Sequence, residues 1–185
     1  MLVQNRLITV WRRNAGATEA DPWVAEAVDE GTVRRYRVED GGDEAMLWIE
    51  AHRVDAGRLA AIEGEIFTFS LARDVGGGSE FPGRWLYIVH TDIPSDVVDD
   101  YNAWYDEEHL PRLVGVPGVE RARRYVADPG LSPRYLTAYD LSIKDAFDSP
   151  EGLTARKTPW TERMRALFQN TRRKMCTLQA SGPTA

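Results

Sequence analysis

The residues best equipped for chemistry lie in one stretch, 101–118, which reads YNAWYDEEHLPRLVGVPG. Its first nine residues hold three aromatic rings, three adjacent acids and His109, one of only three histidines in the chain. An imidazole has an ordinary pKa of about 6.5, so it can accept and return a proton near neutral pH without a cofactor. The stretch therefore predicts a site of general acid–base chemistry.

Helical spacing would gather these side chains on one wall. Tyr101, Tyr105 and His109 follow one another down one face of a helix, and Trp104 and Glu108 lie on an adjoining stripe. We expect His109 to move the proton, a tyrosine hydroxyl to polarise a carbonyl oxygen, and Glu108 to tune the imidazole. The structural alternatives are that the aromatic rings form core and that Glu108 is solvated or paired.

Pro111 predicts where this helix ends. Proline disfavours helical dihedrals in the residue before it, so a helix that begins at Ser95 should stop at about His109. That position would put the imidazole at a helix C-terminus, where an imidazolium can also act as a cap that answers the helix dipole. The functional and the capping interpretations of His109 both remain open at this point.

Further side chains are candidates for substrate binding. Trp104 belongs to the helix, whereas the others come from predicted strands: Tyr87, His90, Arg123 and Tyr139. Strand alternation places His90 and Tyr87 on opposite faces of their strand. Arg123 could present a cation to an anionic substrate. Each has an ordinary alternative, as a core residue or as one half of an ion pair. Periodicity alone does not tell which face of the sheet would line a pocket.

Composition excludes several classes of protein. A net charge of −6 removes most of the electrostatic support for binding nucleic acid. The sequence has no run of about 18 apolar residues and no secretory leader pattern, so we expect a cytoplasmic protein without a membrane partner. The single cysteine, Cys176, cannot form an internal disulfide and is expected to be a structural thiol.

Several catalytic motifs are also missing from the sequence. The histidines and the cysteine show no metal-ligand spacing, so no metal is expected. There is no G-x-S-x-G hydrolase elbow. The glycine cluster 76–78 lacks the lysine and the strand–helix setting of a nucleotide site. We therefore expect chemistry without a cofactor.

The elements that must position these residues form an internal repeat. Each half has the order βαββαβ, and GTVRRYRVED in the first half answers PGVERARRYVAD in the second. Strands are predicted over 7–12, 32–39, 45–52, 66–72, 84–91, 119–127, 134–141 and 172–180, and helices over 22–30, 54–63, 95–109 and 159–170.

The repeat predicts two domains, 1–75 and 84–180, joined by a glycine-rich connector at 74–83. Each βαββαβ unit makes a four-stranded antiparallel sheet with both helices on one face, and the second copy can cover the other face. Only the second half has the aromatic helix. Residues 143–158 are predicted to form a loop that could edge a pocket, which Trp160 could close.

The run 104–111, WYDEEHLP, followed by VPGV at 116–119 and the strand to Tyr125, resembles the EthD-type branch of the dimeric α+β-barrel superfamily. The resemblance covers the second half well and the first half only as a degenerate copy. It implies α+β, ferredoxin-like units that join through their sheets into a barrel, here as a pseudo-dimer within one chain. It also implies a ligand between a sheet and its helices, with His109 as the functional histidine.

The leading hypothesis is a cofactor-independent lyase, isomerase or cyclase that acts on a small aromatic or carbonyl compound. The resemblance also leaves open a non-catalytic binding or stress protein, and a cofactor-free oxygenase or haem-handling protein in which a histidine would ligate the haem. Further pairing of two chains as a homodimer is left open too.

Overall fold

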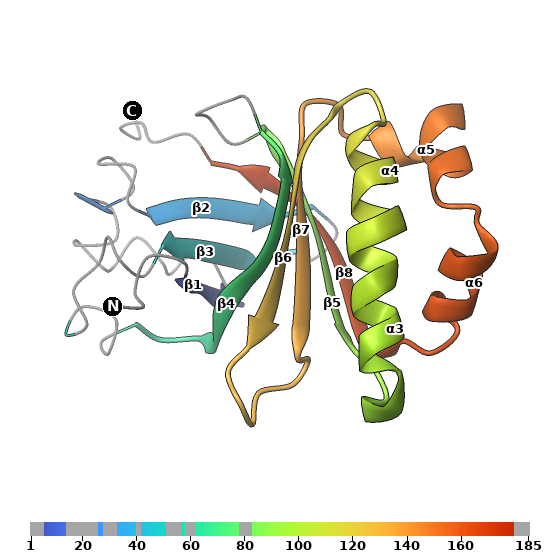
Figure 1. Cartoon of the computed structure of the whole chain (residues 1–185). Coiled ribbons are helices and arrows are strands. Elements are labelled where there is room, and N and C mark those ends of the chain that lie inside the picture. The colour runs from blue at the N-terminus through green and yellow to red at the C-terminus, as the bar shows by residue number, and fades with distance from the viewer. Residues whose placement is uncertain are drawn as a thin grey trace.

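The computed structural model describes residues 6–13, 26–27, 33–39, 42–50, 57, 62–77 and 83–179. Its strands form one closed antiparallel barrel, and the described helices pack on one side of it (Figure 1). The strands of the first half are β1 Arg6–Arg12, β2 Val33–Val38, β3 Ala45–Glu50 and β4 Glu65–Gly76. Those of the second half are β5 Trp85–Asp92, β6 Val119–Ala127, β7 Tyr135–Leu141 and β8 Gln169–Leu178.

Strand order confirms the predicted fold class. The barrel runs β1-β3-β2-β8-β5-β7-β6-β4, so each half has its strands in the order fourth, first, third, second. The two sheets join where β2 pairs with β8 and where β4 pairs with β6. The fourth strand of each half thus pairs with the second strand of the other, as in a two-fold pseudo-dimer. The fold is a tandem pair of ferredoxin-like sheets closed into an α+β barrel.

The predicted strands are confirmed to within a few residues at their ends. The largest difference is at β4, which continues to Gly76 and enters the expected connector, because Asp74, Val75 and Gly76 pair with β6. The two helices predicted for the first half lie almost entirely outside the described residues. Within them, 26–27 and 57 are described in helical conformation, and 62–63, at the predicted end of the second helix, are described outside any helix.

The prediction that the long helix stops at His109 is wrong. The helical run comprises η3 Ser95–Val97, α3 Val98–Ala103, the π-helical turn η4 Trp104–His109 and α4 Leu110–Val114. The N–H of Leu110 donates to the carbonyl of Tyr105, five residues back. Pro111 then falls in the first turn of α4, where the missing N–H of proline is tolerated. The π-turn carries the chain past the proline.

The segment predicted as a pocket-edging loop contains helices. They are η5 Ala146–Asp148 and α5 Pro150–Ala155, and α6 Pro159–Arg165 follows. Ser149 and Thr158 cap α5 and α6 by accepting hydrogen bonds from Gly152 N and Thr161 N, each with a proline next in the chain. Helix α6 ends at Arg165, several residues before the predicted end, because the chain turns there into β8.

The described residues form three buried layers, and two of them bear on the site. One fills the barrel and includes Trp48, Phe69, Leu86 and Ile88. The other lies between the second-half sheet and its helices, and it holds most of the rings of the 101–118 stretch. Figure 1 shows the long helix lying along this sheet, with α5 and α6 beside it. The second layer is where a pocket forms.

Candidate functional site

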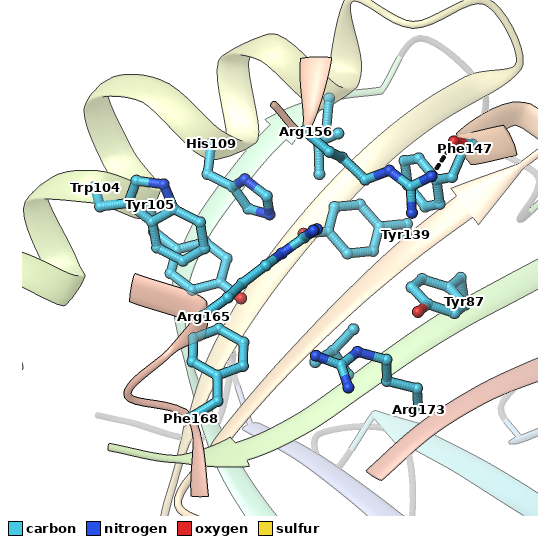
Figure 2. Close-up of a pocket in the computed structure, with 12 residues that line it drawn as sticks. Tyr87, Trp104, Tyr105, His109, Tyr139, Phe147, Arg156, Arg165, Phe168 and Arg173 are labelled. Carbon is cyan, nitrogen blue, oxygen red and sulfur yellow. Dashed lines mark hydrogen bonds between the residues drawn. The ribbon is translucent and has the colours of Figure 1, made fainter. Parts of the chain in front are cut away.

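A pocket of about 190 Å³ lies between the second-half sheet and its helices. Its side chains come from β5, β7 and β8, from the long helix, and from the segment that carries η5, α5 and α6 (Figure 2). Most of them are aromatic or basic, and among the described residues none is acidic. The lining residues are Tyr87, Val89, Trp104, Tyr105, His109, Leu113, Tyr139, Phe147, Arg156, Arg165, Phe168 and Arg173.

His109 forms part of the buried wall of this pocket. Its side chain is only 5% exposed, its ring stacks on Trp104 with centroids 4.1 Å apart, and Tyr105 meets it edge-on at 5.3 Å. Burial, and then the positive charges of Arg165 and Arg156, lower the pKa of His109 to about 3. The imidazole is therefore neutral near pH 7. Its Nδ1 is buried and has no hydrogen-bond partner among the described residues.

Two hydrogen bonds fix helix α6 against the π-turn. The indole Nε1 of Trp104 donates to Thr161 Oγ1 over 3.2 Å. The hydroxyl of Thr158, the cap of α6, donates to the carboxylate of Glu108 over 2.6 Å. These bonds hold the aromatic wall and the helix that carries Arg165 in one arrangement.

Tyr87 and Tyr139 face the pocket as hydrogen-bond donors rather than bases. Burial is the main cause that raises the pKa of Tyr87, and it raises that of Tyr139 well above its ordinary value. Tyr105 also lines the pocket. Tyr101 lies behind it, with ring centroids 4.9 Å apart, and burial raises the pKa of Tyr101 as well.

Arginines supply the charge of the pocket. Figure 2 shows Arg165 reaching across the pocket toward Tyr139, with Arg156 and Arg173 on either side. Arg156 is fixed by hydrogen bonds to the carbonyls of Gly152 and Phe147. Arg165 and Arg173 are exposed residues, so the pocket opens to solvent on their side.

The structure brings together five of the nine side chains predicted for the site. Trp104, Tyr105, His109, Tyr87 and Tyr139 all line the pocket. The helix positions the first three, and neighbouring strands β5 and β7 position the last two, which face each other in the register.

Four predicted side chains do not line this pocket. Tyr101 is one layer behind it, and Glu108 points toward the cap of α6. His90 and Arg123 lie on the opposite face of the sheet, inside the barrel, because they alternate with the residues that face the helices. Trp160 does not close the pocket either, since its Nε1 donates to Asp100.

Inside the barrel, His90 is packed among aromatic rings. Phe67, Trp11 and Phe69 lie 5.3–5.8 Å from its ring, and burial lowers its pKa to about 4. Arg123 forms a buried ion pair with Asp140 over 2.7 Å. These contacts are those of core residues.

Several lining residues were not predicted from the sequence: Val89, Leu113, Phe147, Arg156, Arg165, Phe168 and Arg173. Phe147 and Arg156 lie in segment 143–158, which the sequence predicts to edge a pocket. Alternation along the last strand places Arg173 on one face of the sheet. It does not tell whether that face meets the helices. No spacing pattern singles out Arg165.

A metal site and a membrane-spanning helix are both absent from the part of the chain that the structure describes. No three histidine, cysteine or acidic side chains cluster there as a metal site would require. None of the helices there is long and apolar enough to cross a membrane.

No family model matches the chain, and no curated protein matches it. Solved structures do resemble it at low identity. A ferredoxin-fold protein from Listeria monocytogenes, described as related to antibiotic biosynthesis monooxygenases, is 10% identical with a TM-score of 0.63, over 96% of this chain and 97% of that one. An anthrone oxidase-like protein is 10% identical with a TM-score of 0.60, over 97% and 94%. A haem-degrading enzyme from Listeria monocytogenes is 8% identical with a TM-score of 0.60, over 93% and 98%. These likenesses establish the fold.

Proposed function

We propose that the protein is a cofactor-independent oxygenase that acts on a small, readily ionised aromatic compound in the pocket of the second half. The observation that carries this proposal is a buried, neutral imidazole in the wall of an aromatic pocket. Trp104, Tyr105 and Phe168 offer ring surfaces to a flat substrate, and His109 offers a nitrogen to its proton.

The low basicity of His109 favours such a substrate. General acid–base catalysis works best when the pKa values of donor and acceptor are close, so a weak base needs a substrate whose anion is strongly stabilised. Phenols and CH₂ groups flanked by aromatic rings form such anions by resonance. These electron-rich anions can pass electrons to O₂ without a metal or a flavin.

The overall reaction balances without a further reductant. When an activated CH₂ group becomes a carbonyl, two C–H bonds break, one oxygen atom of O₂ enters the product and the other leaves as water. His109 would take up the first proton and return it to the reduced oxygen. The tyrosine hydroxyls of the sheet would donate hydrogen bonds to the substrate oxygen.

The comparisons support an oxygenase over the lyase, isomerase or cyclase expected from the sequence. Proteins described as anthrone oxidase-like and as related to antibiotic biosynthesis monooxygenases share this fold. Membership of the EthD-like branch, which depends on the 104–111 motif, remains part of this proposal. The small-molecule substrate and a pairing of two chains remain predictions too.

Haem does not fit this pocket. A neutral imidazole is a suitable iron ligand. However, a pocket of about 190 Å³ is too small for the macrocycle, and Trp104 covers one face of the His109 ring at 4.1 Å. We therefore derive no step through haem.

Oxygen uptake tests the proposal. The purified protein would be mixed, in an oxygen electrode, with a panel of phenols and of compounds that carry a CH₂ group between two aromatic rings, with product analysis by mass spectrometry. We expect O₂ uptake matched by a product that gains one oxygen atom, and His109→Gln should lower kcat by about 10²–10⁴-fold. Glu162→Gln, on the exposed side of α6, is the matched control and should leave the rate unchanged.

Other outcomes would replace this function with one of the alternatives. Turnover that continues without O₂ would indicate a lyase, isomerase or cyclase. Tight binding without any product would indicate a non-catalytic binding protein. Full activity in His109→Gln would remove the imidazole from the reaction.

A further inference from the structure

We propose that the pocket selects aromatic compounds that carry a fixed carboxylate, held at the pocket mouth by Arg165 and Arg173 while the ring lies against the aromatic wall. This inference rests on the proposed function, because it takes the same pocket as the substrate site. It adds the chemical class of the substrate and assigns specificity to two arginines that the sequence did not single out.

The arginines of the pocket differ from their sequence neighbours in how they are paired. Arg163 lies two residues before Arg165, and Arg172 directly precedes Arg173. Arg163 forms an ion pair with Asp100, and Arg172 forms one with Glu65. Arg165 and Arg173 have no carboxylate within ion-pair distance among the described residues. Unpaired arginines that converge on one cavity are notable in a chain of net charge −6. An anionic ligand would supply the missing partner.

Positive charges converge on the pocket. The charges of Arg173, Arg156 and Arg165 all act on Tyr87, and those of Arg165 and Arg156 act on His109. Burial chiefly, and then Arg156 and Arg173, lower the pKa of Arg165 itself. The guanidinium groups therefore repel one another across the pocket. A bound anion would relieve this repulsion.

The charged and the aromatic parts of the lining lie at different depths of the pocket. The exposed Arg165 and Arg173 mark the open side, whereas Trp104 and His109 are buried at the far wall. A planar guanidinium binds a carboxylate through paired N–H donors. A ligand with its carboxylate at the mouth would thus direct its ring toward the imidazole. A volume of about 190 Å³ suits a compound of one or two rings.

Arg156 has a different part in this arrangement. Its guanidinium bonds the carbonyls of Gly152 and Phe147 and lies 3.3 Å from Asp148. These contacts use its donors to hold the segment that carries Phe147. The proposal therefore assigns the carboxylate to Arg165 and Arg173 and leaves Arg156 as a support of the pocket wall.

A matched pair of ligands tests this selection on the unmodified protein. Calorimetry would compare 4-hydroxybenzoate with 4-hydroxybenzamide, which has nearly the same shape and no charge, at low and high salt. We expect the carboxylate to bind at least about tenfold tighter at low salt, with a preference that shrinks as salt is raised. Equal affinities, a preference for the amide, or no binding of either compound up to the millimolar range would overturn the proposal.

Variants then locate the selection. Arg165→Gln and Arg173→Gln should each weaken binding of the carboxylate by about 3–10-fold and leave binding of the amide nearly unchanged. Arg163→Gln and Arg172→Gln remove neighbouring charges outside this pocket and should change the carboxylate preference little. An equal loss of preference in the control variants would assign it to the general field of the protein and contradict the proposal.

The two proposals can fail separately. The charge preference is measured by binding alone, so it can hold in a protein that consumes no O₂. Conversely, oxidation of neutral and anionic phenols with equal affinity would support the oxygenase and overturn the carboxylate selection.

Discussion

His109 combines a reactive group with an environment that keeps it uncharged. Its ring contacts those of Trp104 and Tyr105, and Arg165 and Arg156 add positive charge nearby. Both effects disfavour the imidazolium ion, so the residue is a weak base in the free protein. An anionic ligand on the arginines would weaken one of these effects. Binding would then make the histidine a better base at the moment when a substrate is present.

The histidines should make stability depend on pH in a defined window. Folding lowers the pKa of His109 to about 3 and that of His90 to about 4, against about 6.5 in an unfolded chain. Below pH 6.5 the unfolded chain therefore binds protons that the folded protein does not. The free energy of unfolding should fall as pH decreases from 6.5 toward 4, by about 1.4 kcal/mol per pH unit for each histidine, and neither should contribute above that window.

Urea unfolding at pH 5.0, 5.5, 6.0 and 7.5 measures this dependence. His109→Gln should remove one histidine's share of the slope between pH 5 and 6, and His90→Gln should remove the other. The comparison uses slopes, because each variant also loses packing at every pH. A slope unchanged by His109→Gln would show that this imidazole is not held neutral in the folded protein.

The sequence indicates the reactive group but not its state. A histidine among aromatic residues at helical spacing identifies His109, Trp104 and Tyr105. Its protonation depends on Arg156 and Arg165, which come from a distant part of the chain. The sequence also points to Arg123 as the cation for a substrate, whereas the arginines that line the pocket are Arg156, Arg165 and Arg173, and Arg123 pairs with Asp140.

Among the elements, the π-turn decides how the aromatic side chains are presented. Pro111 predicts the end of the helix, because proline disfavours helical dihedrals in the residue before it. The turn over Trp104–His109 shifts the bonding by one residue, and the helix continues as α4. Such turns often occur at functional sites. A proline rule based on α-helical geometry could not predict this, because it does not consider the wider turn.

Packing of η5 under α5 sets the wall that carries Phe147, and Gly152 makes it possible. A Cβ at Gly152 would lie 2.4 Å from the carbonyl oxygen of Ala146 and 2.7 Å from the backbone of Phe147. Gly152→Ala should therefore displace this wall, lower the free energy of unfolding by about 1–3 kcal/mol and weaken ligand binding.

The matched control is Gly115→Ala at the end of α4. A Cβ there meets its nearest atom at 3.4 Å, so the substitution should have little effect on stability or binding. Urea unfolding and calorimetry on both variants check the prediction. Full stability and affinity in Gly152→Ala would mean that η5 and α5 do not pack this closely.

In the whole molecule, the closed barrel separates its own interior from the buried layer between the second-half sheet and its helices. The fold class could be predicted from the βαββαβ repeat. Strand alternation also predicted that His90 lies on the face opposite Tyr87, which the structure confirms. It could not predict which face meets the helices, because both faces of β7 are buried. Placing His90 and Arg123 at the substrate site followed from that ambiguity.

The ion pair inside the barrel should be important to stability. The side chains of Arg123 and Asp140 are 5% and 4% exposed, and Trp48 lies 4.7 Å from the guanidinium. Asp140→Asn leaves the buried cation without a counter-charge and should lower the free energy of unfolding by about 3–5 kcal/mol. Replacing both residues, as Arg123→Met with Asp140→Leu, should recover much of that loss, since no charge is then buried.

Asp74→Asn provides the comparison, because Asp74 pairs with Arg121 at the surface over 2.8 Å. An exposed pair contributes at most about 1 kcal/mol, so this variant should lose far less stability than Asp140→Asn. Chemical denaturation measures all of these variants. Equal losses in the two single variants would show that the barrel interior is accessible to water.

The most direct test is to observe the imidazoles while an aromatic ligand binds. The chain has three histidines, so the ring nitrogens of ¹⁵N-labelled protein give few NMR signals, which His109→Gln and His90→Gln would assign. During a titration with 4-hydroxybenzoate, the signals of His109 should shift in proportion to the bound fraction, while those of His90, on the other face of the sheet, stay in place. A bound ligand that leaves the His109 signals unchanged, or that moves those of His90 instead, would contradict a substrate site between the helices and the second-half sheet.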